Sequence, residues 1–209
     1  MSDNIQNIPT VIFCGGKGTR LMEETEFKPK PMVAVGGMPI VLHIMKIYAH
    51  FGFKKFILCL GYKGQMIKEY FSNPEFASSG LEIILADTGE ETLTGERLLM
   101  VSKYLNGDEF MVTYGDGVSD INIKALVAFH RKQGTIGTIA GVHPYSKYGL
   151  VKIDNKKNLV KGFAQKPLLY DYVSGGFMIF NRQAFDYLDT GPMEDGLIKL
   201  ATKKQLSIY

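Results

Sequence analysis

The sequence predicts an α/β fold in which an open, mostly parallel sheet is flanked by helices. Short apolar runs alternate with longer segments of helical period over roughly the first 130 residues. Continuous apolar runs are typical of strands buried on both faces of a parallel sheet, and the connections between parallel strands are usually helices. After residue 134 the apolar runs follow one another more closely, which predicts a β-rich C-terminal part.

The parallel part is predicted over residues 10–133. Its apolar strands are expected at Thr10–Cys14, Phe56–Leu60, Leu81–Ala86 and Phe110–Thr113. The intervening helices are expected at Pro39–Phe51, Gln65–Phe71 and Leu93–Leu105, followed by Asn122–Lys132. In the first of them, Ile40, His43, Ile44 and Ile47 recur at helical spacing directly after a proline that is well placed to begin a helix.

The C-terminal part is predicted over residues 134–209. Its strands are expected at Thr135–Val142, Gly149–Ile153, Leu159–Phe163 and Val173–Phe180, and the DNKKN segment (154–158) has the composition of a hairpin turn. Two short helices are expected at Gln183–Leu188 and Glu194–Lys203, and Ser207–Tyr209 reads as part of a strand. Because no linker or repeat interrupts the chain, we expect residues 1–209 to form a single domain.

Composition limits the classes to which the chain can belong. Its 209 residues are 45% hydrophobic and 22% charged, which excludes disordered and fibrous classes. A formal net charge of +3 is too small to indicate nucleic-acid binding, and no apolar run approaches the ~20 residues that span a membrane. Residues 1–9 lack the pattern of a signal peptide, and Cys14 and Cys59 lie in apolar runs. We therefore expect a cytoplasmic protein with two reduced core cysteines.

A glycine-rich turn follows the first strand. Gly15, Gly16 and Gly18 allow a close backbone approach to an anion, and successive N–H groups in such a turn can cradle phosphate. The spacing does not match a P-loop, and a dinucleotide fingerprint starting at Gly16 meets Leu21 in place of its third glycine. The turn alone therefore fits either a phosphate cradle or an ordinary connection between a strand and a helix.

Two further segments favour the phosphate interpretation. Lys28-Pro29-Lys30-Pro31 places cations on a loop stiffened by two prolines, close in sequence to Arg20. Asp116 lies between two glycines at the end of the fourth predicted strand, where a carboxylate can either close a tight turn or bind Mg²⁺ together with phosphate oxygens. The carboxyl ends of parallel strands meet at one edge, so these segments predict a nucleoside triphosphate site there.

The motifs together resemble the glucose-1-phosphate cytidylyltransferases, a branch of the sugar nucleotidyltransferase family. The matching segments include CGGKGTRLMEET (14–25), KPKPM (28–32), GYKG (61–64), TGER (94–97) and TYGDG (113–117). The resemblance implies a Rossmann-like, GT-A-like nucleotidyltransferase fold. Residues 10–133 would form its nucleotide-binding part and residues 134–209 its acceptor-binding part. Because the family commonly assembles, a homo-oligomer is one expectation.

The resemblance also implies roles for individual residues. The CTP phosphates and base would lie against Gly15, Gly16, Gly18 and Thr19, with Arg20 on the departing pyrophosphate and Lys30 on the α-phosphate. Asp116, beside Gly115, would bind Mg²⁺. Further nucleotide-binding residues would be Thr94, Gly95 and Arg97, and the acceptor would meet Gln165, Lys166, Ser174 and Gly175.

Several positions depart from the family pattern on the acceptor side. Gln165 replaces a glutamate that contacts sugar hydroxyls, and Ser174 replaces an asparagine near the sugar. A loop before Asp87 is short, and the family's second metal-binding aspartate would fall beyond Tyr209. These differences suggest an acceptor other than glucose 1-phosphate, such as glutamine phosphate for capsule phosphoramidate.

Two functions of other classes remain open at this point. A catalytically silent, nucleotide-binding regulatory paralogue would explain the missing second aspartate. A dinucleotide-dependent oxidoreductase is disfavoured by the absent third glycine. No nucleophilic triad is expected, and the four histidines (His43, His50, His130 and His143) are interpreted as structural.

Overall fold

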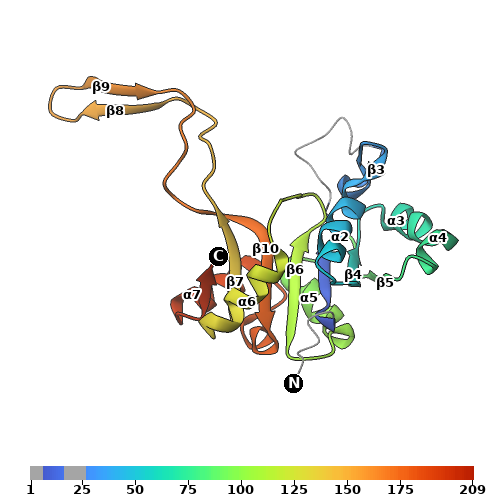
Figure 1. Cartoon of the computed structure of the whole chain (residues 1–209). Coiled ribbons are helices and arrows are strands. Elements are labelled where there is room, and N and C mark those ends of the chain that lie inside the picture. Colours follow the sequence, from blue (N-terminus) through green and yellow to red (C-terminus); the bar gives the residue numbers. More distant parts are fainter. Residues whose placement is uncertain (1–6, 17–26) are drawn as a thin grey trace.

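A seven-stranded mixed sheet forms the centre of the computed structural model, which describes residues 7–16 and 27–209 (Figure 1). Its strands are β1 (Thr10–Phe13), β4 (Lys55–Leu60), β5 (Glu82–Asp87), β6 (Glu109–Tyr114), β7 (Gly137–Val142), β10 (Val173–Asn181) and β11 (Leu206–Ile208). They lie in the order β11-β7-β10-β6-β1-β4-β5. Only β10 runs antiparallel to its neighbours β6 and β7. The predicted mostly parallel α/β sheet is therefore confirmed.

Helices cover both faces of this sheet (Figure 1). The helices α2 (Ile40–His50), α3 (Gly64–Phe71) and α6 (Ile123–Gln133) pack on one face, and α5 (Thr94–Val101) and α7 (Met193–Thr202) pack on the other. Alternation along β1 explains the two cores, because Ile12 joins the first apolar cluster while Val11 and Phe13 join the second. The central strands β1 and β4 are buried on both faces, as their sequences predict.

Strand β5 departs from the prediction that its apolar run is buried on both faces. It is the last strand of the sheet and pairs only with β4. Within it only Ala86 is buried, while Glu82 and Asp87 are exposed. An edge strand and a central strand can carry similar apolar runs, and only the strand order distinguishes them.

Local geometry also differs from the prediction in several short segments. The helix expected over Leu93–Leu105 is divided into α5 and a 3₁₀ turn, η3 (Ser102–Tyr104), and the helix expected over Gln183–Leu188 is a 3₁₀ segment, η4 (Arg182–Tyr187). The sequence analysis missed four short elements: η2 (Lys30–Met32), α4 (Pro74–Ala77) and the hairpin formed by β2 (Ala34–Val35) and β3 (Met38–Pro39). All are too short to give a periodic signal.

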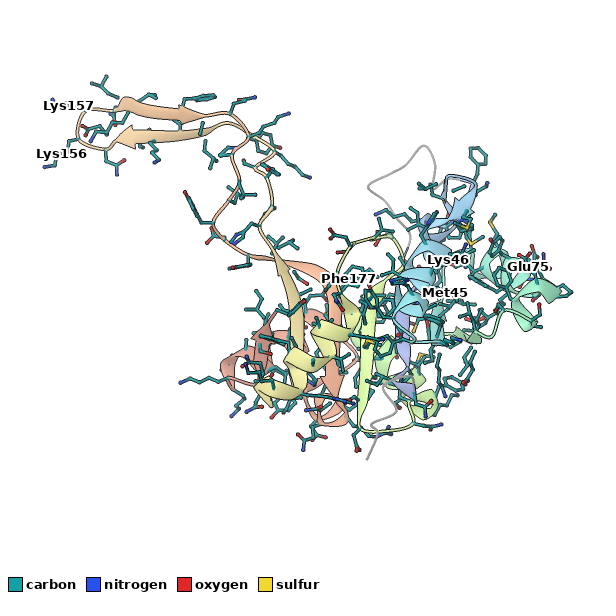
Figure 2. The ribbon with its side chains drawn as sticks, in the orientation of Figure 1. Met45, Lys46, Glu75, Lys156, Lys157 and Phe177 are labelled. Atoms are coloured by element: carbon teal, nitrogen blue, oxygen red, sulfur yellow. The ribbon has the colours of Figure 1, made fainter. Side chains whose placement is uncertain are left out.

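A two-stranded hairpin projects away from the sheet (Figure 1). It consists of β8 (Leu150–Asp154) and β9 (Leu159–Ala164), and Lys156 and Lys157 lie at its tip as the DNKKN segment predicts (Figure 2). The cross-strand pairs Val151–Phe163 and Ile153–Val160 place four exposed apolar side chains on one face of the hairpin.

The two cysteines are free and buried, as predicted. Burial is the main cause that raises the pKa of Cys59 to about 12 and raises the pKa of Cys14 well above its ordinary value. Both are therefore thiols rather than thiolates at neutral pH. Among the helices of the described residues, none is both long and apolar enough to cross a membrane.

A buried hydrogen-bond chain connects α6 to the C-terminal strands. The His130 ring contacts the Thr138 hydroxyl through Nδ1 at 2.8 Å and the Asn181 amide oxygen through Nε2 at 3.1 Å. Because an amide oxygen only accepts, Nε2 carries the proton and Nδ1 accepts from Thr138. The Thr138 hydroxyl also contacts Ser207 of β11 at 2.7 Å. The prediction of a structural role for His130 agrees with these contacts.

The burial of His130 predicts a pH dependence of stability. Burial lowers the pKa of His130 below its ordinary value of 6.5, although the hydrogen bond to Asn181 opposes this shift. The unfolded chain therefore binds the proton first as the pH falls below 6.5, and the stabilisation present above that pH is lost. We expect urea unfolding at pH 7.5 and 5.5 to show this loss. The loss should be smaller in His130→Gln, whereas the variant His143→Gln at an exposed position should behave as the wild type does.

Candidate active site

A cavity of about 490 Å³ lies at the carboxyl ends of the central strands. One wall is formed by the end of β1, including Gly15 and Gly16, and another by Tyr114 and Asp116 after β6. The segment after β5 closes the third side with residues 90–93. The remaining residues that line the cavity are Phe13, Cys14, Lys30, Pro31, Thr94 and Arg97. This is the edge at which ligands bind in open α/β sheets, so the cavity lies where the sequence predicts a binding site.

Lys30 and Asp116 form an ion pair at this cavity. Their side chains are 25% and 33% exposed, so both remain accessible to a ligand. Lys30 begins the 3₁₀ turn η2, which follows Pro29 in an extended conformation and contains the buried Pro31. The two prolines therefore fix the position of the lysine, as the KPKP segment predicts. With one cation and one carboxylate beside the β1 turn, the cavity can hold a phosphate chain and a divalent ion.

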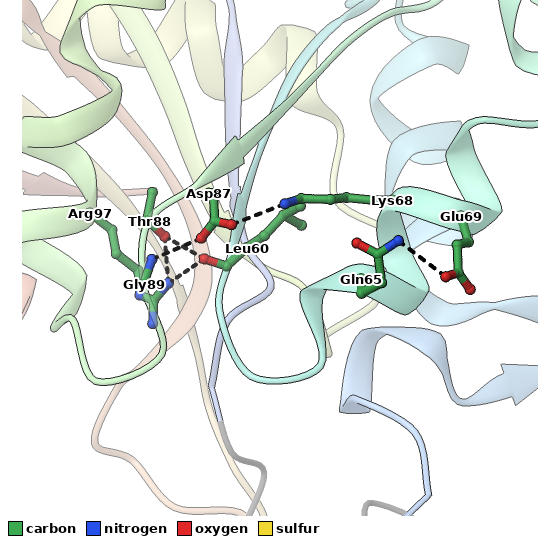
Figure 3. Close-up of polar contacts among 8 residues, drawn as sticks. All are labelled: Leu60, Gln65, Lys68, Glu69, Asp87, Thr88, Gly89 and Arg97. Carbon is green, nitrogen blue, oxygen red and sulfur yellow. Dashed lines mark hydrogen bonds and ion pairs between the residues drawn. The ribbon is translucent and has the colours of Figure 1, made fainter.

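Arg97 of α5, labelled in Figure 3, lines the cavity and is buried, with a relative exposure of 4%. Its guanidinium makes five hydrogen bonds, which matches its five N–H donors. Nη1 donates to the Leu60 carbonyl at 2.9 Å and to the Thr88 hydroxyl. The other bonds reach the carbonyls of Thr92 (3.0 Å), Glu90 (3.3 Å) and Gly15 (3.4 Å). One side chain thereby holds together the ends of β1, β4 and β5.

The approach of this guanidinium requires a glycine at position 61. A Cβ there would lie 2.6 Å from the Gly89 carbonyl oxygen and 2.9 Å from Arg97 Nη1, closer than real Cβ contacts come. Nearby, Asp87 accepts from Lys68 at 3.0 Å, and this hydrogen bond is the first cause of the lowered pKa of Asp87 (Figure 3). The GYKG segment (61–64) and the segment 87–89 thus meet at Arg97.

Thr94 and Tyr114 line the cavity from different elements, α5 and β6. The Tyr114 hydroxyl donates to Glu194 of α7 at 2.6 Å, and Thr94 accepts from the Met193 amide at 2.8 Å. Burial is the main cause that raises the pKa of Tyr114, and the hydrogen bond to Glu194 adds to it. Tyr114 is therefore a neutral hydrogen-bond donor at neutral pH.

The family model described as "Nucleotidyl transferase" matches residues 9–203. The chain belongs to the nucleotidyl transferase family. It is 37% identical over 221 residues to a probable glucose-1-phosphate cytidylyltransferase of Bacillus subtilis and 39% identical over 223 residues to the glucose-1-phosphate cytidylyltransferase of Salmonella typhimurium. Each alignment covers 95% of this chain and 86% of the relative. The predicted cytidylyltransferase branch is confirmed, and with it an enzyme of the nucleotidyltransferase class.

Solved structures agree with the fold. HddC from Yersinia pseudotuberculosis has a TM-score of 0.72 at 24% identity, over 97% of this chain and 89% of that one. A UDP-glucose pyrophosphorylase complexed with UDP-glucose has a TM-score of 0.69 at 18% identity, over 97% of this chain and 90% of that one. The architecture of this nucleotidyl transferase is therefore shared with both proteins.

The structure brings together one group of the predicted site residues. Gly15, Gly16, Lys30, Asp116, Thr94 and Arg97 line the same cavity. Gly95 and Gly115 lie directly beside lining residues. Gly18, Thr19 and Arg20 fall outside the described residues, and so their predicted roles have no geometry here.

The predicted acceptor residues lie apart from this group. Gln165 and Lys166 are exposed at the base of the projecting hairpin and do not line the cavity. The backbone of Lys166 has a φ of 45°, a value that residues other than glycine rarely adopt. Ser174 pairs with Gly141, and Gly175 lies near Ala140. Gly176 of β10 lies against Tyr114, which lines the cavity: a Cβ there would lie 3.2 Å from the Tyr114 ring.

Sequence reasoning missed the segment 90–93 and Tyr114 as walls of the cavity. Tyr114 had a usable signal, because it directly follows a buried strand at the same edge as Asp116. The segment 90–93 had none. Its place in the cavity depends on hydrogen bonds from Arg97 to the Glu90 and Thr92 carbonyls.

We expect Arg97→Lys to destabilise the protein although it preserves the charge. A lysine cannot reproduce five donors in a fixed fork, and buried carbonyls would lose their partners, at a cost of about 2–4 kcal/mol. Urea unfolding measures this loss. The control Arg131→Lys affects an ion pair with Glu109 whose arginine side chain is 34% exposed, and should cost less than about 1 kcal/mol. Equal losses in the two variants would contradict a special role for Arg97.

Proposed function

We propose that this nucleotidyl transferase is a Mg²⁺-dependent cytidylyltransferase. It transfers CMP from CTP to a phosphorylated small-molecule acceptor, with release of pyrophosphate, in the synthesis of surface polysaccharide. The observation that carries the proposal is the ion pair of Lys30 and Asp116 on the cavity that also contains Gly15 and Gly16. The choice of CTP rests on relatives named as cytidylyltransferases.

The residues of the cavity fit a magnesium ion. Mg²⁺ is usually held by one or two carboxylates together with substrate phosphate oxygens, rather than by a complete cage of protein ligands. Asp116 provides one partly exposed carboxylate at the cavity. The described residues contain no group of three or more side chains that would form such a cage. Asp116 would hold the ion, which would supply neutralisation of the negative charge on the phosphates.

The reaction requires little acid–base chemistry from the protein. A phosphate monoester is mostly dianionic at neutral pH, so one of its oxygens can attack the α-phosphorus of CTP without a general base. A new P–O bond forms while the bond from the α-phosphorus to the oxygen bridging to the β-phosphorus breaks, and the electron pair leaves with pyrophosphate. The protein aligns the two phosphates and offsets their repulsion. Lys30 offsets this repulsion at the α-phosphate.

We propose that residues 134–209 form the acceptor-binding part. Lys166 would contact the acceptor phosphate. In the structure Lys166 lies outside the cavity, so binding requires the base of the hairpin to approach the sheet. Gln165 and Ser174 favour an acceptor with fewer hydroxyl contacts than glucose 1-phosphate, for example glutamine phosphate, because hydroxyl-binding sites discriminate strongly.

We expect Asp116→Asn to abolish most activity. Loss of the carboxylate removes the Mg²⁺ ligand, and kcat should fall at least about 100-fold because charge stabilisation of this kind is a large term in catalysis. Pyrophosphate release with CTP and Mg²⁺ measures it. The control is Asp120→Asn, a variant four residues further along the same loop whose aspartate does not line this cavity. Wild-type rates in Asp116→Asn would contradict the assignment.

A panel of acceptors separates the possible substrates. We expect pyrophosphate release with CTP and at least one phosphate monoester, and the panel should include glucose 1-phosphate and glutamine phosphate. Turnover of glucose 1-phosphate at ordinary substrate concentrations would show that Gln165 and Ser174 are tolerated in a sugar site. Activity with only glutamine phosphate would indicate that the acceptor pocket differs from a sugar-binding site at Gln165 and Ser174. Binding of CTP without turnover of any acceptor would indicate a silent regulatory paralogue.

A further inference from the structure

Glu194, an exposed residue in the first turn of α7, contacts two residues that line the cavity. One carboxylate oxygen accepts from the Tyr114 hydroxyl at 2.6 Å, and the other lies 3.5 Å from the Thr94 hydroxyl. Tyr114 and Thr94 both line the cavity, whereas Glu194 does not. A single side chain of the C-terminal part therefore connects two walls of the nucleotide cavity.

The backbone around Glu194 makes this contact specific. The Gly95 amide donates to the Gly191 carbonyl at 3.0 Å, and the Met193 amide donates to Thr94 at 2.8 Å. A Cβ at position 95 would lie 2.6 Å from the carbonyl oxygens of Asp189 and Gly191. The start of α5 and the start of α7 thus approach each other so closely that only glycine fits between them. These contacts hold the backbone that carries Glu194 next to Thr94.

Tyr114 also has little freedom apart from its hydroxyl. Its ring packs against Phe13 with a centroid separation of 5.7 Å, and Gly176 of β10 also lies close to it. The ring position is therefore set by packing, and the direction of its hydroxyl is set by Glu194. Two residues away, Asp116 forms its ion pair with Lys30.

We propose that Glu194 is a positioning residue of the nucleotide site, which fixes the Tyr114 hydroxyl and Thr94 so that CTP meets a preformed wall. This inference rests on the proposed function for the identity of the nucleotide. Glu194 does not itself touch CTP. Loss of the carboxylate leaves the Tyr114 hydroxyl and Thr94 to reorient, and the nucleotide must then order them on binding.

The test is a double-mutant cycle on the direct binding of CTP, measured with Mg²⁺ by equilibrium dialysis of the full chain. We expect Glu194→Ala and Tyr114→Phe each to raise the Kd for CTP about 5- to 10-fold, the effect of one lost hydrogen bond. The double variant should be no weaker than either single one, because both remove the same interaction. Glu194→Gln keeps an acceptor for Tyr114 and should bind CTP within about 2-fold of the wild type.

The control Asp195→Ala removes the neighbouring charge from the same turn of α7. Its Kd should match that of the wild type, which separates positioning from a general effect of charge at this helix end. Thermal unfolding of every variant shows whether the fold is retained. If Tyr114→Phe retains the fold but Glu194→Ala does not, the Kd values for CTP of Tyr114→Phe and Glu194→Gln decide whether Glu194 has the positioning role.

The possible outcomes distinguish this inference from the proposed function. Unchanged CTP binding in Glu194→Ala, or additive losses in the double variant, would overturn the positioning role alone. A wild-type protein that binds no CTP would overturn the proposed function and this inference with it. In the expected result, kcat at saturating CTP changes less than the KM for CTP, since the chemistry is performed by other residues.

Discussion

The arrangement of the cavity at the strand ends depends on one buried guanidinium. Arg97 donates to carbonyls that belong to the ends of β1 and β4 and to the segment after β5, and no carboxylate is among its hydrogen-bond partners in the described structure. Five satisfied donors offset the cost of burying the charge. The need for space around this group also explains why position 61 is a glycine. The strand ends that form the cavity are therefore held by a single residue of α5.

The cavity combines this rigid frame with one accessible charged pair. Lys30 comes from the turn η2 and Asp116 from the loop after β6, and each neutralises the other until a ligand enters. A triphosphate with a divalent ion offers each of them a partner of the opposite charge, so the cavity exchanges one set of ion pairs for another. Rigid backbone and exchangeable charges are what in-line transfer between phosphates requires.

The C-terminal part contributes to the cavity through packing as well as through its proposed acceptor site. Strand β10 lies beside β6 and sets the position of Tyr114, and α7 reaches its hydroxyl through Glu194. The hairpin of β8 and β9 extends from the same part with an apolar face exposed. Two-stranded hairpins are only marginally stable alone, and this one projects away from the sheet (Figure 1).

The sequence by itself determined the alternation of strands and helices, the edge at which the site lies and the family. Buried apolar runs, the glycine turn after β1 and the Lys-Pro and Asp-Gly segments are local signals, and Gly15, Gly16, Lys30 and Asp116 from these segments line one cavity. Tertiary structure alone decided that β5 is an edge strand, that Arg97 donates its hydrogen bonds to the strand ends and the segment after β5, and that Glu194 contacts Tyr114. These features join residues as much as 82 positions apart, and no local pattern records which distant groups a fold will bring into contact.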